Sequence, residues 1–473
     1  MHMEEQSKSR ANGLVFRMPG VRALRVPLAI PKPNNPLSST LLLVYGFASL
    51  IMLGTILLVL PVSSRSGQFT SPVDALFTAT SAVCVTGLVV VDTGTYWGTF
   101  GQAVLLVLFQ IGGLGFITGA TLLLLAIGGR FGLREKLVIT ESMGLDQLGG
   151  VIGVVGRVAL FSLIVESIGA AIFYFRWVSN GDTGTSVWTA VFHAASAFNN
   201  CGMDILGNFR SLSGYQGEAV ILLTTALLII LGSTGYIVVA DFVRNRSFIK
   251  LSLDSKIVLV ATLSLLMLGT LFYLAAEFAN PATLGPLPFP QKILVAFFQS
   301  VTPRTAGFTA IDIGGLKQNS LFFTMFLMCI GGAAGSAAGG VKVNTIGVLV
   351  MTALSLVRGR DNVEAFGRQL TRQAVYRAIT LFLFYLGVVS FVALTLSLTE
   401  KFPLDSILFE TFSALGTVGL TTGITPSLSI AGRFIIIAAM FVGRLGPLTF
   451  MAFLVRHWQP ADMGYPHETI RLG

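Results

Sequence analysis

The chain has 473 residues, of which 53% are hydrophobic and 11% are charged, and its formal net charge is +9. Soluble domains carry about 25% charged residues, so this composition excludes an ordinary soluble protein and indicates a surface that mostly faces lipid. The three cysteines form no CxxC pair and give no sign of a disulfide framework or a metal-binding motif.

Long apolar runs follow one another along the chain. A helix needs about 20 apolar residues to cross a bilayer, and most of the runs reach that length. The two short runs after residue 319 flank a Gly/Ala stretch, so we interpret them as one broken helix and expect eight spanning helices. The runs are 38–60, 102–127, 158–175, 219–240, 257–276, 320–330, 343–357, 378–398 and 432–454.

Most of the 31 Lys and Arg residues lie in alternate connecting segments. Positive residues mark the cytoplasmic side of a membrane protein. We therefore expect a multi-pass protein of the plasma (inner) membrane with both termini in the cytoplasm, in contact with lipid headgroups and not with nucleic acid. The basic segments are 1–37, 128–157, 241–256, 357–377 and the residues after 455.

Two sequence marks recur four times in the same order. The first is a polar tetrapeptide that ends in Gly and an apolar residue: Val85-Thr86-Gly87-Leu88, Asn200-Cys201-Gly202-Met203, Thr305-Ala306-Gly307-Phe308 and Thr417-Val418-Gly419-Leu420. The second is a glycine pair or triplet in the apolar run that follows, beginning at Gly112, Gly232, Gly331 and Gly443. Each mark alone is weak, since small residues often mean only close helix packing, but the ordered recurrence predicts an internal repeat.

We therefore predict an all-α integral membrane protein. Each repeat has a helix leading outward, a re-entrant short helix and loop, and a helix leading back, and the repeats surround a pseudo-fourfold pore. Irregular backbone is tolerated inside a membrane only where protein buries it or it lines a water-filled path. The expected segments are 1–37 (cytoplasmic), 38–127, 156–240, 256–357 and 376–455 (repeats) and 456–473 (cytoplasmic tail).

The tetrapeptides suit a dehydrated monovalent cation. Rings of backbone carbonyls replace the hydration shell of an ion without a buried charge, and glycine gives the backbone the freedom to aim them at one axis. Short helices that end at the loops present their partly negative C-termini to the cation. The residues expected to bind ions are therefore Val85, Thr86, Gly87, Asn200, Cys201, Gly202, Thr305, Ala306, Gly307, Thr417, Val418 and Gly419. This chemistry leaves potassium and sodium undistinguished.

The phrases Gln110–Phe116, Thr302–Phe308 and Gly443–Pro447 resemble the Trk/Ktr/HKT superfamily of potassium transporters, and most of all the membrane subunit of bacterial Ktr systems. The resemblance covers about residues 38–455. It implies potassium uptake through a selective pore, with the four tetrapeptide glycines as the filter. It also implies a homodimer, a cytoplasmic nucleotide-binding regulatory ring, and stimulation by sodium.

The same resemblance implies an intramembrane gating loop beneath the filter. Its residues would be Gly331, Gly332, Gly335, Ser336, Gly339 and Gly340, with Lys342 and Arg444 nearby. Lys342 is either a pore-side charge or a residue at the cytoplasmic interface, and Arg444 either a fixed charge near the pore or a helix-locking ion pair. Met203, where the family pattern has Phe, and the Ala-rich loop depart from that pattern.

Several other polar residues lie in or near the apolar runs, and each has a structural interpretation beside a functional one. For Glu166 a hydrogen bond to an Arg or a hydroxyl is favoured over a proton relay, and for His193 a hydrogen-bonded structural role is favoured. Asp92, Asp204 and Asp312 follow filter glycines. They either raise the cation concentration at the outer mouth or act as ordinary capping acids.

Competing functions remain at this point. A carrier with alternating access is disfavoured, because such carriers often show inverted repeats and a midplane binding site, whereas these loops all enter from one side. A sodium-selective or sodium-coupled transporter of the same fold is the closest alternative. No catalytic dyad is evident, so we expect no enzyme and no covalently bound cofactor; potassium occupies the pore, and a nucleotide acts only through a partner.

Overall fold

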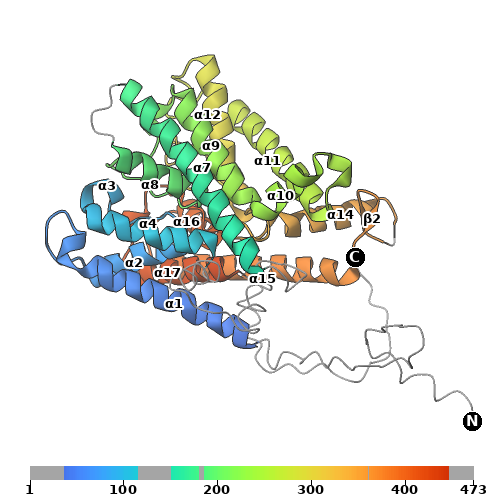
Figure 1. Ribbon diagram of the computed structural model, residues 1–473, viewed down its shortest axis with the longest axis horizontal. Coiled ribbons are helices and arrows are strands. Elements are labelled where there is room, and N and C mark those ends of the chain that lie inside the picture. The colour runs from blue at the N-terminus through green and yellow to red at the C-terminus, as the bar shows by residue number, and fades with distance from the viewer. Residues whose placement is uncertain (1–36, 116–150, 181–185, 361, 447–473) are drawn as a thin grey trace, which may run out of the picture.

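A computed structural model describes residues 37–115, 151–180, 186–360 and 362–446. This part of the chain is mostly helical (Figure 1). Its longer helices are α1 (Leu37–Val59), α2 (Pro72–Val83), α4 (Thr99–Leu114), α7 (Val151–Ser179), α8 (Val187–Phe198), α9 (Ala219–Thr234), α10 (Tyr236–Asn245), α11 (Leu253–Glu277), α12 (Phe289–Val301), α13 (Gln318–Cys329), α14 (Val343–Val357), α15 (Arg372–Thr399), α16 (Leu404–Gly416) and α17 (Ile430–Leu445). Short elements are η1 (Pro61–Ser63), α3 (Thr93–Tyr96), η2 (Ser213–Tyr215), η3 (Phe248–Lys250), η4 (Thr425–Ser427) and the β1–β2 hairpin (Glu364–Ala365, Arg368–Gln369).

A long helix, a short helix and a second apolar helix follow one another four times in chain order. The sets are α1, α2, α4; α7, α8, α9; α11, α12, α13; and α15, α16, α17. Within the described residues, α7 (from Gly153), α11 and α15 are each long and apolar enough to cross a membrane. These helices expose large apolar side chains such as Leu163, Leu271 and Leu394, as expected where lipid is the solvent.

The short helices α2, α8, α12 and α16 are buried over most of their length. Local sequence fixes where they begin. Pro72 stands at the first position of α2, where its missing N–H costs no hydrogen bond. Ser186 and Thr189 form a capping box at the start of α8, which satisfies two otherwise unpaired backbone donors.

The returning helices are shorter than their apolar runs. A continuous span over 219–240 is a wrong expectation, since α9 ends at Thr234 and α10 leaves at 93°. Gly235 lies between them with a φ of 79°, a conformation that ends helices and that glycine adopts without strain. The same conformation ends α4 at Gly115 and α17 at Gly446; most of the remainder of those runs lies outside the described residues.

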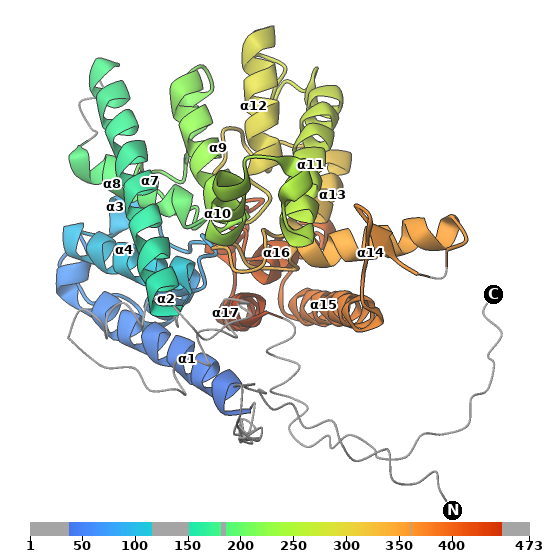
Figure 2. The same cartoon turned by 45° about the vertical axis from the view of Figure 1, so that its right-hand side comes forward.

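The stretch 320–357 is broken, as expected, but its two helices do not share a line. Figure 2 shows α14 running across the end of α13. The residues between them, Ile330 to Lys342, form a folded loop closed by a parallel bridge between Ile330 and Val341. This segment is called the crossing loop below.

The buried apolar side chains form two main clusters. One joins α1, α2 and α4 to α15, α16 and α17, through residues such as Phe77, Phe109 and Met440. The other joins the helices from α7 to α13, through residues such as Phe173, Phe298 and Met325. The first and last helix sets, at opposite ends of the chain, therefore pack against each other.

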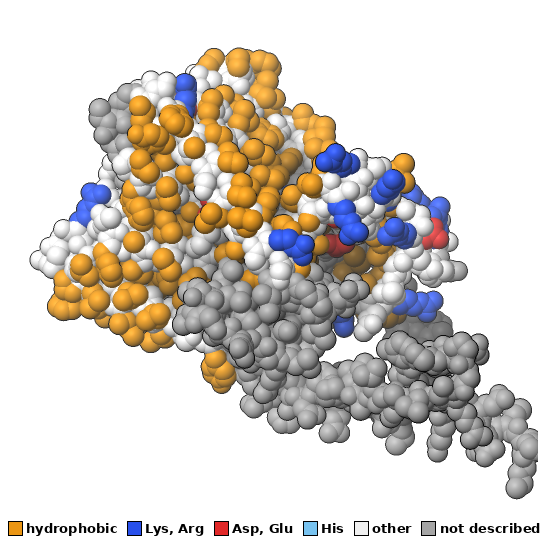
Figure 3. All heavy atoms as spheres, in the orientation of Figure 1, with side chains coloured by type: hydrophobic (Ala, Val, Ile, Leu, Met, Phe, Trp, Pro, Cys, Tyr) orange, Lys and Arg blue, Asp and Glu red, His pale blue; other side chains and the backbone are white. Residues whose placement is uncertain are grey.

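The surface separates into an apolar flank and a basic end. Figure 3 shows hydrophobic side chains covering the face over α7, α9 and α11, and Lys and Arg side chains gathered over α10, α14 and the hairpin. Exposed basic residues there include Arg244, Lys250, Arg358 and Arg360. Segments 241–256 and 357–377 thus lie at one end of the molecule. The other basic segments lie wholly or mostly outside the described residues.

Candidate functional site: four filter loops and a crossing loop

Each tetrapeptide begins within four residues of the C-terminal end of a short buried helix and has an unusual backbone. Its first residue has a positive φ: 55° at Val85, 58° at Asn200, 66° at Thr305 and 51° at Thr417. Its glycine also has a positive φ: 89° at Gly87, 76° at Gly202 and Gly307, and 93° at Gly419. The residue between them keeps a negative φ, so the sign alternates along every loop, whereas a β-strand has no such alternation.

This backbone is strained at three β-branched residues, Val85, Thr305 and Thr417. A bulky residue at positive φ is a true outlier and costs about 1–3 kcal/mol, which persists only where the surroundings over-determine the conformation. The first residue has a positive φ in all four loops, and the fourth case, Asn200, tolerates it better than the three β-branched residues. This recurrence makes the four segments candidates for a functional role.

Serines support three of the loops from the preceding helix. Ser81 accepts the Thr86 N–H on its carbonyl (2.8 Å) and the Gly87 N–H on its hydroxyl (3.0 Å). Ser413 does the same for Val418 and Gly419 (2.8 and 3.1 Å). In the second loop the Ser196 carbonyl accepts the Cys201 N–H (2.8 Å).

The third loop is held differently. The Ala306 N–H bonds to the Thr302 carbonyl (3.0 Å), and the Thr302 hydroxyl bonds to the Phe308 carbonyl. Ser300, which the sequence aligns loosely with the other serines, instead bonds to the Leu266 carbonyl on α11 (2.9 Å). The four loops therefore share a backbone shape but not a uniform set of supports.

The four glycines approach one another closely. A Cβ added to any of them would lie less than 3.0 Å from a carbonyl oxygen of the adjacent loop: Cys201 for Gly87, Ala306 for Gly202, Val418 for Gly307 and Thr86 for Gly419. These contacts run from the first loop to the second, third and fourth and back to the first. The chain thus places all twelve predicted ion-binding residues in one closed ring of loops, and only glycine fits at the contact points.

A cavity of about 500 Å³ opens on one side of the ring. All four glycines line it, together with Asp204 and Asp312. Burial raises the pKa of Asp204 to about 6; the nearby Asp92 carboxylate adds to the rise, and the Leu206 N–H and Arg210 oppose it. This side of the ring is called the outer vestibule below.

Asp92, the third acid singled out from the sequence, has a different role. Its carboxylate caps α3 by accepting the Thr95 N–H (2.7 Å) and also accepts the Phe209 N–H (2.6 Å) from the segment after the second loop. Asp92 therefore connects α3 to the segment after the second loop. Of the two roles considered from the sequence, this is the capping role and not that of an acid that attracts cations.

The second glycine mark brings each returning helix against its own short helix. A Cβ on Gly112 would collide with the Val83 carbonyl, one on Gly232 with that of Phe198, and one on Gly443 with that of Leu415. The fourth member, Gly331, lies instead against Gly339 and Val341 within the crossing loop. Three of the marks thus act as close-packing points, and the fourth shapes a separate element.

The crossing loop lies against the ring on the side away from the outer vestibule. The Ala333 N–H bonds to the Ser233 carbonyl (2.8 Å) and the Ala337 N–H to the Gly232 carbonyl (3.3 Å), both at the end of α9. A Cβ on Gly339 would meet the Thr417 side chain, and one on Gly340 would lie 3.3 Å from the Gly416 carbonyl. The predicted gating residues therefore lie directly beside the entrance to the fourth loop.

Arg444 connects this loop to two helices. Its guanidinium donates to the Ala337 carbonyl of the crossing loop and to the Gly112 carbonyl near the end of α4. Its recorded hydrogen bonds go to carbonyl oxygens rather than to a carboxylate. Lys342 donates to the Ala338 carbonyl within the same loop.

Glu166 lies in a network that reaches the second tetrapeptide loop. It accepts hydrogen bonds from Gln110 on α4 (2.9 Å), Ser162 (2.8 Å) and Asn199 (3.2 Å). Asn199 directly precedes Asn200. The hydroxyl partner expected for Glu166 is thus Ser162, and the amide partners are additional. His193 bonds to the Thr225 hydroxyl through Nε2 (3.2 Å), in agreement with a structural role.

Residues 37–463 match the model of a protein family described as "TrkH: Cation transport protein". The chain belongs to the TrkH family. It is 40% identical to the Ktr system potassium uptake protein B of Bacillus subtilis, over 91% of this chain and 96% of the relative. It is 39% identical to the potassium/sodium uptake protein NtpJ of Enterococcus hirae, over 92% and 98%.

A solved structure has the same fold. The potassium transporter TrkH from Vibrio parahaemolyticus matches with a TM-score of 0.72 and 20% identity, over 90% of this chain and 86% of the other. These relatives are uptake proteins and not enzymes, and the long apolar helices make this TrkH family member a multi-pass membrane protein.

Sequence reasoning missed several supporting residues of this family member. Ser81, Ser196 and Ser413 each stand six residues before a filter glycine, and that spacing was a usable signal. Asp74 and Arg433 form an ion pair between α2 and α17, but they are 359 residues apart, and no local pattern indicates their contact.

Proposed function

We propose that this protein takes up potassium ions through a selective, channel-like pore. The observation that carries the proposal is the closed ring of four glycine loops, three of them strained at a β-branched residue, that lines an outer vestibule. In this proposal the helix sets are four repeats with eight spans in a pseudo-fourfold arrangement, and the ring of loops is their common selectivity filter.

The ring acts on an ion through backbone oxygens. Carbonyls of Thr86, Cys201, Ala306 and Val418 lie at the contacts between loops, where they offer ligands to a cation that has shed its water. The four short helices end at the loops and add their partial negative charge. Asp204 and Asp312 on the vestibule wall raise the local cation concentration when ionised.

The crossing loop is the proposed gate. It lies against α9 and the fourth filter loop, and Arg444 holds it to α4. An ion leaving the filter toward the basic end must pass this segment. We propose that the loop, with Gly331, Gly332, Gly335, Ser336, Gly339, Gly340 and Lys342, moves aside when the pore conducts.

Assembly is part of the same proposal. A relative is named as protein B of a Ktr system, and the word system supports a partner protein. We propose a nucleotide-binding regulatory ring at the basic end, with a homodimer in the plasma (inner) membrane and both termini cytoplasmic. We also propose that sodium stimulates potassium uptake by this protein.

The alternative is a sodium-selective or sodium-coupled transporter of the same fold. It is favoured by one observation, the name of the relative NtpJ, which includes both potassium and sodium. The two alternatives differ in ion discrimination, so a flux comparison separates them.

The test is ion flux into liposomes that carry the purified protein, with potassium and sodium compared. We expect potassium-selective flux. Gly87→Ser places a side chain where the Cys201 carbonyl now lies and should lower the potassium-to-sodium flux ratio by about tenfold or more, the change that corresponds to about 1.4 kcal/mol.

The matched control is Gly67→Ser. Gly67 also has a positive φ, 67°, but nothing lies within 4 Å of the added Cβ. This variant carries the same backbone strain outside the ring and should keep the wild-type ratio. Equal fluxes of potassium and sodium in the wild type, or an unchanged ratio in Gly87→Ser, would contradict the proposed filter.

A further inference from the structure

The filter ring has one junction that the chain does not connect directly. Neighbouring loops one and two, two and three, and three and four belong to consecutive helix sets. The fourth junction joins the last set to the first: Gly419 contacts the Thr86 carbonyl, and its added Cβ would lie 3.2 Å from the Gly87 Cα. Only noncovalent contacts hold this junction, which is called the seam below.

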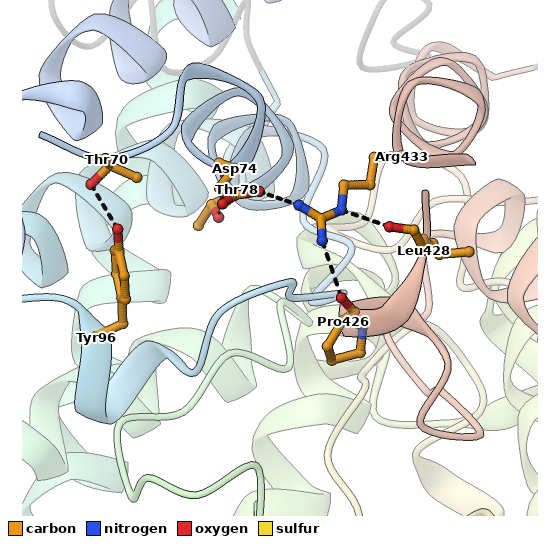
Figure 4. A network of polar contacts seen from close by, with 7 residues as sticks. All are labelled: Thr70, Asp74, Thr78, Tyr96, Pro426, Leu428 and Arg433. Carbon is orange, nitrogen blue, oxygen red and sulfur yellow. Dashed lines mark hydrogen bonds and ion pairs between the residues drawn. The ribbon is translucent and has the colours of Figure 1, made fainter. Parts of the chain in front are cut away.

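Arg433 on α17 reaches Asp74 on α2, so its side chain joins the last helix set to the first (Figure 4). Its guanidinium pairs with the Asp74 carboxylate on α2, donates to the Leu428 carbonyl through Nε (3.1 Å) and to the Pro426 carbonyl through Nη2 (3.1 Å). The two charged side chains are only 21% and 20% exposed. An ion pair that is partly buried and uses the planar fork of arginine is stronger and more directional than a surface pair.

The acceptors of Arg433 lie on the segment that follows the fourth filter loop. Its carbonyl partners, Pro426 and Leu428, lie in and just after η4, which stands between Gly419 and α17. Arg433 therefore connects three parts at once: the returning helix, the segment leaving the fourth loop, and the short helix that carries the first loop.

Glu410 holds the same segment from the other side. It lies on α16 and is fully buried. Its Oε1 accepts the hydroxyl of Thr425 (3.0 Å) and that of Thr421, and these two hydroxyls lie 2.9 Å apart. Its Oε2 has no hydrogen-bond partner among the residues that the structure describes. The corresponding residues nine positions before the other filter glycines are Thr78, His193 and Phe298, so this carboxylate belongs to the fourth loop alone.

We propose that Asp74, Arg433 and Glu410 are positioning residues for ion selectivity. Together they hold the fourth filter loop against the first and so keep the ring closed at the seam. The proposal rests on the proposed function of the ring as a filter. None of the three residues contacts an ion in this arrangement; they act through the carbonyls of Thr86 and Val418.

Discrimination between two cations of the same charge depends on the size of the ring and on the number of oxygens that face the ion. Such a site works only while its surrounding groups hold it within about 0.5 Å of the productive geometry. If the seam loosens, the fourth loop can move away from the first, and water can then take the place of some carbonyl ligands of the ion. Sodium would then keep more of its water, and the free-energy penalty that excludes it from the ring would be lost.

The experiment compares potassium and sodium flux in liposomes for the wild type, Asp74→Ala and Arg433→Gln. Asp74→Ala removes the bond across the seam and leaves the contacts of Arg433 with its own loop. We expect the potassium-to-sodium ratio to fall by about tenfold in both, the change that corresponds to the loss of a charge-assisted hydrogen bond. Asp74→Glu, which keeps the charge, should retain most of the ratio.

The loop side of the network is tested in the same way. Glu410→Ala removes the acceptor of both threonine hydroxyls and should lower the ratio, whereas Glu410→Gln keeps an oxygen at that position and should largely preserve it. Each protein is measured as the monodisperse full-length fraction, and its thermal stability is recorded beside the flux.

The control is Arg176→Gln. Arg176 pairs with Glu218 (2.7 Å) between α7 and the start of α9, inside one helix set; its side chain is 36% exposed, against 21% for Arg433. Its loss should lower thermal stability without changing the ion ratio. An unchanged ratio in Asp74→Ala and Arg433→Gln, with only stability reduced, would overturn the proposal.

The Gly87→Ser variant distinguishes a failure of the seam proposal from a failure of the proposed filter. If Gly87→Ser lowers the ratio while the seam variants leave it unchanged, the filter stands and the seam proposal fails. If Gly87→Ser also leaves the ratio unchanged, the proposed filter itself is wrong, and the seam proposal fails with it.

Discussion

At the scale of single residues, three of the four tetrapeptide loops hold a β-branched residue in a conformation that such residues avoid. Val85, Thr305 and Thr417 are β-branched yet have positive φ, and each costs about 1–3 kcal/mol. Ser81 and Ser413 offset part of this cost by binding two consecutive N–H groups of their loops. The loops are therefore held from behind, which leaves the carbonyls that face the neighbouring loops available to an ion.

Asp204 gives a pH prediction at this scale. Its pKa is raised to about 6 because the carboxyl is buried and Asp92 is close. A raised pKa means that the group is ionised above pH 6 and neutral below it. Lowering the outer pH from 7.5 to 5 removes this charge from the vestibule and should reduce potassium uptake at low potassium by about threefold.

The measurement is the initial rate of rubidium uptake against outer pH. Asp204→Asn should abolish this step in the pH profile, while Asp405→Asn, at the start of α16 and away from the vestibule, should keep it. Identical profiles for the wild type and Asp204→Asn would mean that Asp204 does not act on the entering ion.

At the scale of elements, helix ends matter more than helix lengths. Helices α4, α9 and α17 all end at a glycine with a φ near 80°, at Gly115, Gly235 and Gly446. The early ends of α4 and α9 leave the Gly112, Gly232 and Ser233 carbonyls free to accept hydrogen bonds from Arg444 and from the crossing loop. Had α9 continued as one straight span, the Ala333 and Ala337 N–H groups would lack these partners.

Asn344 holds the crossing loop, and its replacement gives the prediction at the scale of elements. On the first turn of α14, its Oδ1 accepts the Ala334 N–H of the crossing loop (3.1 Å), and its Nδ2 donates to Asp254 at the start of α11. Asn344→Ala should free the loop and raise potassium flux without any regulator by about fivefold, since one hydrogen bond contributes about 1 kcal/mol.

The control variant is Thr352→Ala, which changes α14 where the hydroxyl bonds only to its own helix, at the Val348 carbonyl (2.8 Å). Liposome flux of the two variants is compared at equal protein content. If Asn344→Ala leaves flux unchanged while thermal stability shows that α14 is intact, Asn344 does not restrain the gate.

At the scale of the whole molecule, the charge distribution predicts orientation. The basic side chains over α10, α14 and the hairpin lie at one end (Figure 3), and positive residues mark the cytoplasmic side. Cys84, Cys201 and Cys329 are buried, so cysteines introduced at the surface can be labelled against a low background.

We expect Gln68→Cys, between α1 and α2, to react with a membrane-impermeant maleimide in intact cells. Ile249 lies between α10 and α11, and its side chain is 82% exposed. The variant Ile249→Cys should react only after the cells are permeabilised. Labelling of position 249 in intact cells would reverse the proposed orientation.

Much of this protein was accessible from the sequence alone because the relevant signals are local. Apolar runs follow from the cost of placing polar groups in lipid, and the mostly helical fold of the described residues follows from them. The glycines of the four loops were marked by the recurring tetrapeptides, since only glycine tolerates both a positive φ and the close approach of another backbone. The start of the crossing loop was marked by the second glycine mark, at Gly331.

The tertiary structure alone decided which of these segments meet. The ring order of the four loops, the bend at Gly235, and the contrast between Asp92 as a cap and Asp204 on the vestibule wall depend on packing between distant segments. Asp74 and Arg433 are the clearest case, because their contact joins α2 to α17 across 359 residues. The energy of such a contact depends on three-dimensional distance, which neither residue type nor spacing along the chain encodes locally.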